Sequence, residues 1–133
     1  MRFLRKAIGA KFVKRALDAG YKPAEMPLDE EKRIEDLKNL KLVEKNIDKD
    51  KRFSSFPKLA ATLTECDEAA INIIDDDTQY CKVSYGQSLA GNIMHKEIPR
   101  QITICSHVLN NNSKTLMIND LSKDARTKEL FIV

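Results

Sequence analysis

The chain has 133 residues, of which 42% are apolar and 32% are charged, with 6% aromatic residues and no Trp. This length and composition are typical of one globular domain with a mostly aliphatic core. The net charge of +3 is unevenly distributed, because residues 1–17 contain six Lys and Arg and no acid, so that the rest sums to −3. A mildly acidic body argues against nucleic-acid binding, which needs a basic face.

Cysteine usage and hydropathy bear on the compartment. Cys66, Cys81 and Cys105 are odd in number and contain no CxxC pair, which is typical of a reducing compartment and predicts a cytoplasmic protein. No apolar run approaches the ~20 residues that span a bilayer. The basic start of the chain lacks the apolar stretch that a secretory signal needs.

The basic N-terminal segment is expected to be a helix over residues 2–19, followed by a linker to residue 28. Gly20 is suited to the position after the helix end. The apolar residues with a spacing of four are Leu4, Ile8, Phe12 and Ala16. Three roles remain open: a helix that packs on a partner or stays loosely ordered, a helix that lies on an anionic membrane surface through residues 1–17, and an organelle transit segment. We separate residues 1–28 from a domain over residues 29–133.

Two amphipathic helices are expected next. Asp29 can cap the first, and its apolar residues continue to Ile47. Ser54 or Ser55 can cap the second, and Pro57 fits its first turn. The apolar stripe expected to face the core from the second helix is formed by Phe53, Phe56, Leu59, Ala60 and Leu63. The amphipathic helices can pair with those of a second copy, and we therefore predict a homodimer.

The centre of the chain predicts an antiparallel hairpin with strands over residues 69–74 and 79–85. The acids of residues 75–77 supply turn chemistry between the strands, and Lys82 is expected to be a surface charge. After a long loop, a short helix capped by Thr103, a third strand over residues 115–118 and a helical segment from Ser122 are expected. Helices that flank one antiparallel sheet make an α+β fold.

Several residues invite a chemical role. The carboxylates of residues 75–77 are ligand types for a hard cation, but a hairpin turn also explains them. Cys105 and His107 suggest a nucleophile and base, although a spacing of two on a helix points them ~200° apart. Arg100 can hold an anion or form a surface salt bridge. We therefore predict no catalytic residue and no metal site, and leave the cofactor open.

In the order in which they occur, several segments resemble the GAF family of sensory domains over residues 30–133. The segments that carry the resemblance are Ile71-Asn72-Ile73-Ile74-Asp75, Asp77-Thr78-Gln79-Tyr80-Cys81-Lys82, Pro99-Arg100, Thr103-Ile104-Cys105-Ser106-His107 and Asp124-Ala125-Arg126. The chain departs from the family where Tyr80 replaces the usual Trp and where no Pro stands beside Arg126. The family's remaining strands and closing helix do not follow, so a GAF-like sheet incomplete at the C-terminus is expected.

The resemblance implies a regulatory, dimerising module of a signal-transduction protein that binds a small molecule. It implies cyclic nucleotides, tetrapyrroles or other small molecules as ligands. The ligand-binding residues implied are Tyr80, Arg100, Cys105 and His107. An output enzyme domain would belong to the parent protein rather than to this segment. The alternative is a small thiol-dependent oxidoreductase on a GAF-like fold, because one branch of that fold reduces methionine sulfoxide with cysteines.

Overall fold

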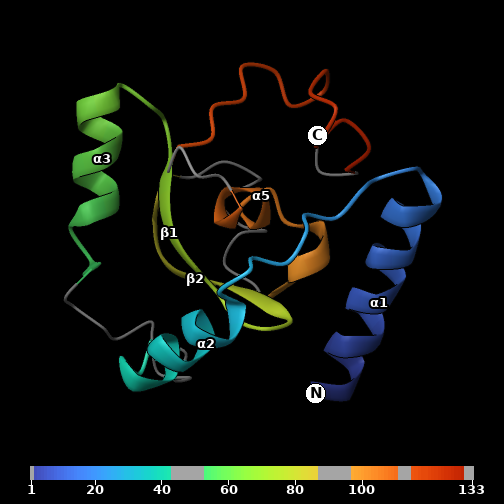
Figure 1. Cartoon of the computed structure of the whole chain (residues 1–133). Coiled ribbons are helices and arrows are strands. Elements are labelled where there is room, and N and C mark those ends of the chain that lie inside the picture. Colours follow the sequence, from blue (N-terminus) through green and yellow to red (C-terminus); the bar gives the residue numbers. More distant parts are fainter. Residues whose placement is uncertain (1, 43–52, 87–96, 111–114, 131–133) are drawn as a thin grey trace. The chain divides into compact units, whose positions relative to one another are not determined.

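The computed structural model describes residues 2–42, 53–86, 97–110 and 115–130. They form two compact units, one of Asp29–Glu97 and one of Met1–Leu28 together with Ile98–Val133. Helices occur in both units and an antiparallel strand pair lies in the first, so the fold is mixed α+β (Figure 1).

The first unit is built on an antiparallel hairpin of β1 (Ala69–Ile74) and β2 (Thr78–Tyr85), as the sequence predicted. The turn closes where the backbone N–H of Asp75 donates to the carbonyl of Thr78 at 2.8 Å. The carboxylates of Asp75 and Asp76 each accept a hydrogen bond from the backbone N–H of the next residue, at 2.7 and 2.9 Å. These acids therefore serve the turn.

A β-bulge interrupts the hairpin at Lys82. The register passes from Ile71 opposite Val83 to Asn72 opposite Cys81, so that Lys82 has no residue opposite it. Lys82 is only 5% exposed, and the prediction that it is a surface charge is wrong. The extra residue interrupts the alternation of the strand, which a strictly alternating pattern cannot anticipate.

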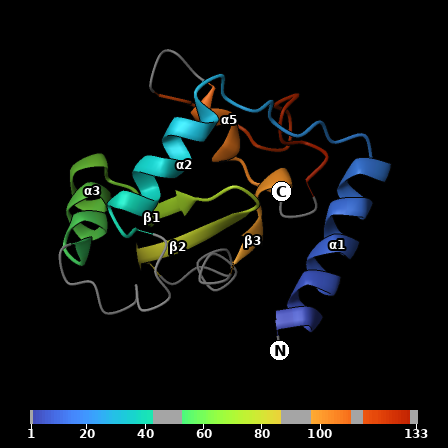
Figure 2. The ribbon, with the colours of Figure 1, turned by 60° about the horizontal axis from the view of Figure 1, so that its bottom comes forward.

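Helix α2 (Glu30–Asn39) lies beside the hairpin (Figure 2) and is fastened to it by Arg33. The guanidinium donates from Nη1 to the carbonyl of Ile74 at 2.5 Å. It also donates from Nε and Nη2 to the two carboxylate oxygens of Glu30, at 2.8 and 2.7 Å. One side chain therefore joins the first turn of the helix to the end of β1.

Both ends of α2 differ in detail from the expectation. Asp29 stands at the N-cap position, but its side chain makes no capping hydrogen bond, because φ −101° and ψ 22° lie outside the extended geometry that capping uses. The helix ends at Asn39, and Lys41 then adopts a left-handed conformation with φ 53°. Residues 40–42 form turns, so the predicted helix is wrong there, and the rest of the expected continuation to Ile47 lies outside the described residues.

Helix α3 (Phe56–Thr64) packs on β1 and β2, but not through the stripe that the sequence predicted. Its buried residues are Pro57 and Ala61. The large side chains of Phe56, Leu59 and Leu63 are 53%, 55% and 75% exposed. At 100° per residue these side chains point roughly 150° away from the buried pair. Small residues at the contact allow the helix to approach the strands closely.

The second unit begins with α1 (Arg2–Asp18), as expected, and the helix ends in a Schellman motif. Gly20 has φ +96° and donates its N–H to the carbonyl of Leu17, while Tyr21 donates to Ala16, both at 3.0 Å. Ala16 and Tyr21 then join Ile102 and Leu130 in the buried core of this unit.

One face of α1 packs on β3 (Ile98–Pro99) and on the 3-10 helix η3 (Arg100–Ile102). Gly9 permits this contact, because an added Cβ would lie 2.9 Å from Pro99 Cγ. Of the described residues of the predicted fourth-residue set, Ala16 is buried and Phe12 is 39% exposed, and Gly9 is buried as well.

The end of the described chain has less regular structure than expected. A short helix, α5 (Ser106–Leu109), is present. Residues 115–118, expected to be a strand, are irregular, and residues 121–130 form turns rather than a helix. The strand prediction rested on β-propensity, which is satisfied only where a neighbouring strand completes the ladder.

Replacing Arg33 with Met keeps an unbranched side chain but removes every donor of the guanidinium. We expect the free energy of unfolding to fall by about 2 kcal/mol, because the carbonyl of Ile74 and the carboxylate of Glu30 lose their donor. Urea unfolding at pH 7 measures the change.

Lys32→Met is the matched control, because Lys32 pairs with Asp36 at 2.9 Å on the exposed side of the same helix. We expect no measurable change for this variant. Equal effects of the two substitutions would show that Arg33 does not fasten α2 to the hairpin.

Candidate functional site

Three of the four predicted ligand-binding residues lie on one short segment of the second unit. Arg100 begins η3, Cys105 occupies the N-cap position of α5, and His107 lies within α5. Tyr80 lies on β2 in the first unit. The candidate site is therefore built from the segment 100–107 and its partners in the second unit.

A pair of buried hydroxyls fixes this segment. Thr103 Oγ1 and Ser106 Oγ lie 2.7 Å apart, and the carbonyl oxygen of Arg100 lies 3.1 and 2.8 Å from them. Thr103 and Ser106 are 3% and 4% exposed. The shared carbonyl acceptor holds η3 against the start of α5 and so positions Cys105 and His107. Thr103 was expected to cap a helix, but its hydroxyl bonds the carbonyl and the neighbouring hydroxyl instead.

Arg100 is a buried cation, only 5% exposed. The alternative reading of this residue as part of a surface salt bridge is therefore wrong. A guanidinium held away from bulk water is suited to a planar anionic group, because its donors form a fixed fork.

His107 bonds Tyr21, a partner 86 residues away in the sequence. The imidazole Nε2 lies 3.1 Å from the Tyr21 hydroxyl, and the rings meet edge to face with centroids 6.1 Å apart at 88°. Burial raises the pKa of Tyr21 to about 12. This contact ties the linker after α1 to α5. No local sequence pattern signals it, apart from the place of Tyr21 just after Gly20.

The protonation of His107 is set by burial and by two charged neighbours. Burial lowers the pKa of His107, the Arg126 cation lowers it further, and the Asp124 carboxylate partly opposes them. Arg126 donates from Nε and Nη2 to the two oxygens of Asp124, at 2.8 and 2.6 Å. These bonds hold the pKa of Asp124 well below its usual range. Burial and the Arg126 cation therefore favour the neutral form of His107.

This geometry suits a positioned neutral imidazole rather than a nucleophile and base pair. Nε2 of His107 is engaged by the hydroxyl of Tyr21, and Cys105 precedes it by two residues on the start of α5. In this arrangement the imidazole of His107 can line a binding site and form hydrogen bonds there, and its charge can change with pH.

Cys66, Cys81 and Cys105 form no disulfide and lie in different surroundings. Cys66 is exposed after the end of α3, where Sγ donates to the carbonyl of Thr64 at 3.6 Å. Cys81 on β2 and Cys105 are half-buried. In the part of the chain that the structure describes, no group of three His, Cys, Asp or Glu side chains is placed to hold a metal ion.

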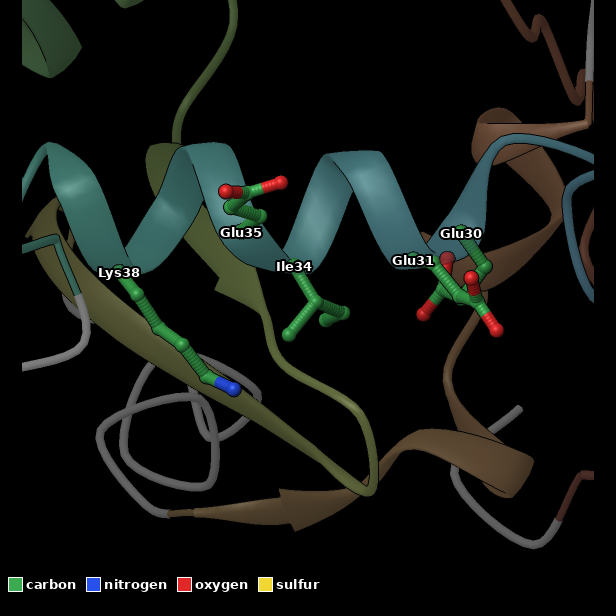
Figure 3. Close-up of a pocket in the computed structure, with 5 residues that line it drawn as sticks. All are labelled: Glu30, Glu31, Ile34, Glu35 and Lys38. Carbon is green, nitrogen blue, oxygen red and sulfur yellow. The ribbon is translucent and has the colours of Figure 1, made fainter.

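A separate hollow of about 380 Å³ lies along α2. It is lined by Glu30, Glu31, Ile34, Glu35 and Lys38. Figure 3 shows Ile34 pointing away from the helix between the acids of the first turn and Lys38. Glu30 already bonds Arg33. The predicted residues Tyr80, Arg100, Cys105 and His107 are not part of its lining.

Comparison with models of protein families and with curated protein sequences finds no match for this chain. Across the described residues, no helix has the length and apolar character needed to cross a membrane.

Acidification is expected to destabilise the protein through His107. In the unfolded chain His binds a proton with a pKa of about 6.5, whereas burial and Arg126 make the folded protein bind it less readily. The unfolded state then holds more protons, so the contribution of neutral His107 is present above pH ~6.5 and is lost as the pH falls. Urea unfolding between pH 7.5 and 5 should show this decline, with a slope of at most about 1.4 kcal/mol per pH unit.

His107→Asn should flatten the dependence in this pH range, which lies above the titration of ordinary carboxylates near pH ~4. His95→Asn removes the other histidine, so comparison of the two variants separates its share of the slope from that of His107. An unchanged slope in His107→Asn would assign the dependence to another group.

Proposed function

We propose that the chain is a GAF-like regulatory module of a cytoplasmic signal-transduction protein, which binds a small molecule, forms a dimer, or does both. The support is the ordered set of sequence segments given above, together with an α+β arrangement in which helices flank an antiparallel hairpin. Chemistry catalysed by the parent protein would belong to an output domain.

One observation carries the proposal: the side chain of Arg33 on α2 donates both to Glu30 of the same helix and to the carbonyl of Ile74 at the end of β1. A regulatory module must convert a change near its sheet into a change of its helices, and a ligand can do so only by binding two arrangements with different affinity. The Arg33 contact gives the hairpin a rigid connection to a helix. A displacement of β1 would move the first turn of α2 with it.

The proposed ligand site is the segment 100–107 of the second unit. Tyr80, which the family resemblance also implies, lies in the first unit and is not included in this site. Arg100 would bind an anionic group of the ligand, since the planar fork of guanidinium donors matches the oxygens of a carboxylate or phosphate. His107 would contribute its ring and Cys105 a small apolar surface. Among the ligand classes that the resemblance implies, this arrangement favours those that carry an anion, such as cyclic nucleotides.

A thermal-shift panel of cyclic nucleotides, tetrapyrroles and anionic metabolites tests ligand binding by the full chain. A ligand present at 100 times its Kd adds about 2.7 kcal/mol, which for a chain of this size raises Tm on the order of 10 °C. Arg100→Lys keeps the charge but loses the planar fork, and should reduce the shift for an anionic ligand at least several-fold.

Arg15→Lys is the matched control, because the same exchange is made at an exposed position on α1. If no compound shifts Tm while the chain remains dimeric, ligand sensing is excluded and dimerisation remains. An anionic ligand whose shift is equal in Arg100→Lys would place the site elsewhere.

The alternative, a thiol-dependent oxidoreductase, requires one cysteine with an activated thiolate. Under the regulatory proposal, iodoacetamide should alkylate exposed Cys66 at the rate of an ordinary thiol and half-buried Cys81 and Cys105 more slowly. Peptide mass spectrometry after timed quenching gives the three rates. A thiol that reacts on the order of 100 times faster than free cysteine would favour the enzyme.

Contact of residues 1–17 with an anionic membrane surface stays a prediction. Lys11, Lys14 and Arg15 are exposed on α1, on the side left open by its packing on β3 and η3. Among the described side chains of α1, over residues 9–18, these cations are more continuous than the exposed apolar surface, which favours weak, salt-sensitive attraction over insertion.

A further inference from the structure

Helix α3 presents a continuous apolar ridge to solvent. We define the α3 ridge as Phe56, Leu59 and Leu63, which are 53%, 55% and 75% exposed. Their spacing of three and four residues places them on one side of the helix, over two turns. This is the spacing with which one helix packs along another.

The α3 ridge is not the face by which the helix joins its own unit. Pro57 and Ala61 fill that role against β1 and β2, and they are buried. Large apolar residues are therefore exposed on a helix whose opposite side is already packed. Grouped exposure of this kind marks an interaction site more often than isolated exposed Leu residues do.

The residues beside the α3 ridge determine which kind of protein surface can pack against it. Ser55, Ala60 and Thr62 flank it, and all three are exposed and uncharged. The charged Lys58 lies on the far side of the helix, roughly 130° from the ridge at 100° per residue. An uncharged apolar stripe brings no like charges together when it meets an identical stripe, so it is complementary to itself.

We propose that the α3 ridge binds the α3 ridge of a second copy of the chain, with the two helices antiparallel. This inference rests on the dimerising part of the proposed function and names its interface. Antiparallel packing places the positive end of each helix dipole beside the negative end of the other. A two-fold axis between Leu59 and Ala60 then brings Phe56 of each copy against Leu63 of the other.

The size of the α3 ridge sets the strength of the contact. Three side chains that each expose more than half of their surface contribute on the order of 350 Å² per copy, or about 700 Å² in the pair. This is below the ~1,200 Å² of standard stable interfaces. The dimer should therefore dissociate in the micromolar range, so that its population can respond to conditions.

Sedimentation velocity of the full chain from about 1 to 300 μM tests the interface. We expect a concentration-dependent dimer for the wild type and a monomer for Leu59→Glu, with Kd raised at least 100-fold. Leu40→Glu is the matched control, because Leu40 is 62% exposed at the end of α2 in the same unit. It should dimerise like the wild type. Circular dichroism and urea unfolding confirm that each variant is folded.

The orientation is tested by charge pairing. Phe56→Lys alone and Leu63→Glu alone should each abolish the dimer, because each places a charge in the interface without an opposite charge on the other copy. In the double variant the antiparallel arrangement sets each Lys opposite a Glu of the other copy, and dimerisation should return. A parallel arrangement would set like charges together, and the double variant would stay monomeric.

The outcomes separate this inference from the broader proposal. A wild-type dimer that Leu59→Glu leaves intact overturns the α3 interface while dimerisation stands. A wild type that stays monomeric at 300 μM overturns both the interface and the dimerising part of the proposed function, and leaves ligand binding to the thermal-shift panel. A double variant that stays monomeric overturns the antiparallel orientation.

Discussion

The guanidinium of Arg33 is the contact on which the position of α2 against the hairpin depends. It reaches the carbonyl of Ile74 at the end of β1 while both oxygens of Glu30 hold it in place. No residue of α2 is fully buried, and its apolar residues Ile34 and Leu37 are half-buried. An ion pair that is 20% and 15% exposed at its two side chains, with a carbonyl acceptor, joins the helix to the hairpin. Helix position is then set by directional bonds.

In residues 1–28 and 98–133 the corresponding role is shared by apolar packing and hydroxyl bonds. Ala16 and Tyr21 pack with Ile102 and Leu130, and the end of α1 is closed by its own backbone. Thr103 and Ser106 fix the chain at the carbonyl of Arg100. The candidate ligand residues are thus held by groups that are buried and satisfied, which keeps them in place before any ligand binds.

Local signals in the sequence predicted the hairpin, the first helix and the left-handed glycine at its end. β-branched residues around an acidic turn and Gly20 after a helical run each encode their conformation nearby. The buried side of α3 was not predicted, because an apolar stripe shows that a face will be covered but not by what. The bond between Tyr21 and His107 was also missed, since it joins positions 86 residues apart. The buried state of Arg100 depends on the folded environment and has no local signature.

Because of the bulge at Lys82, β2 contains one residue more than its pairing with β1 requires. The residue pairs on either side of Lys82 are in step with the ladder, and only Lys82 itself lacks a counterpart. Loss of this one residue would leave a regular two-stranded ladder, whereas loss of a residue elsewhere in β2 would turn every later side chain to the opposite face. Position 82 is therefore the place where this strand can change in length during evolution without changing which side chains face the core.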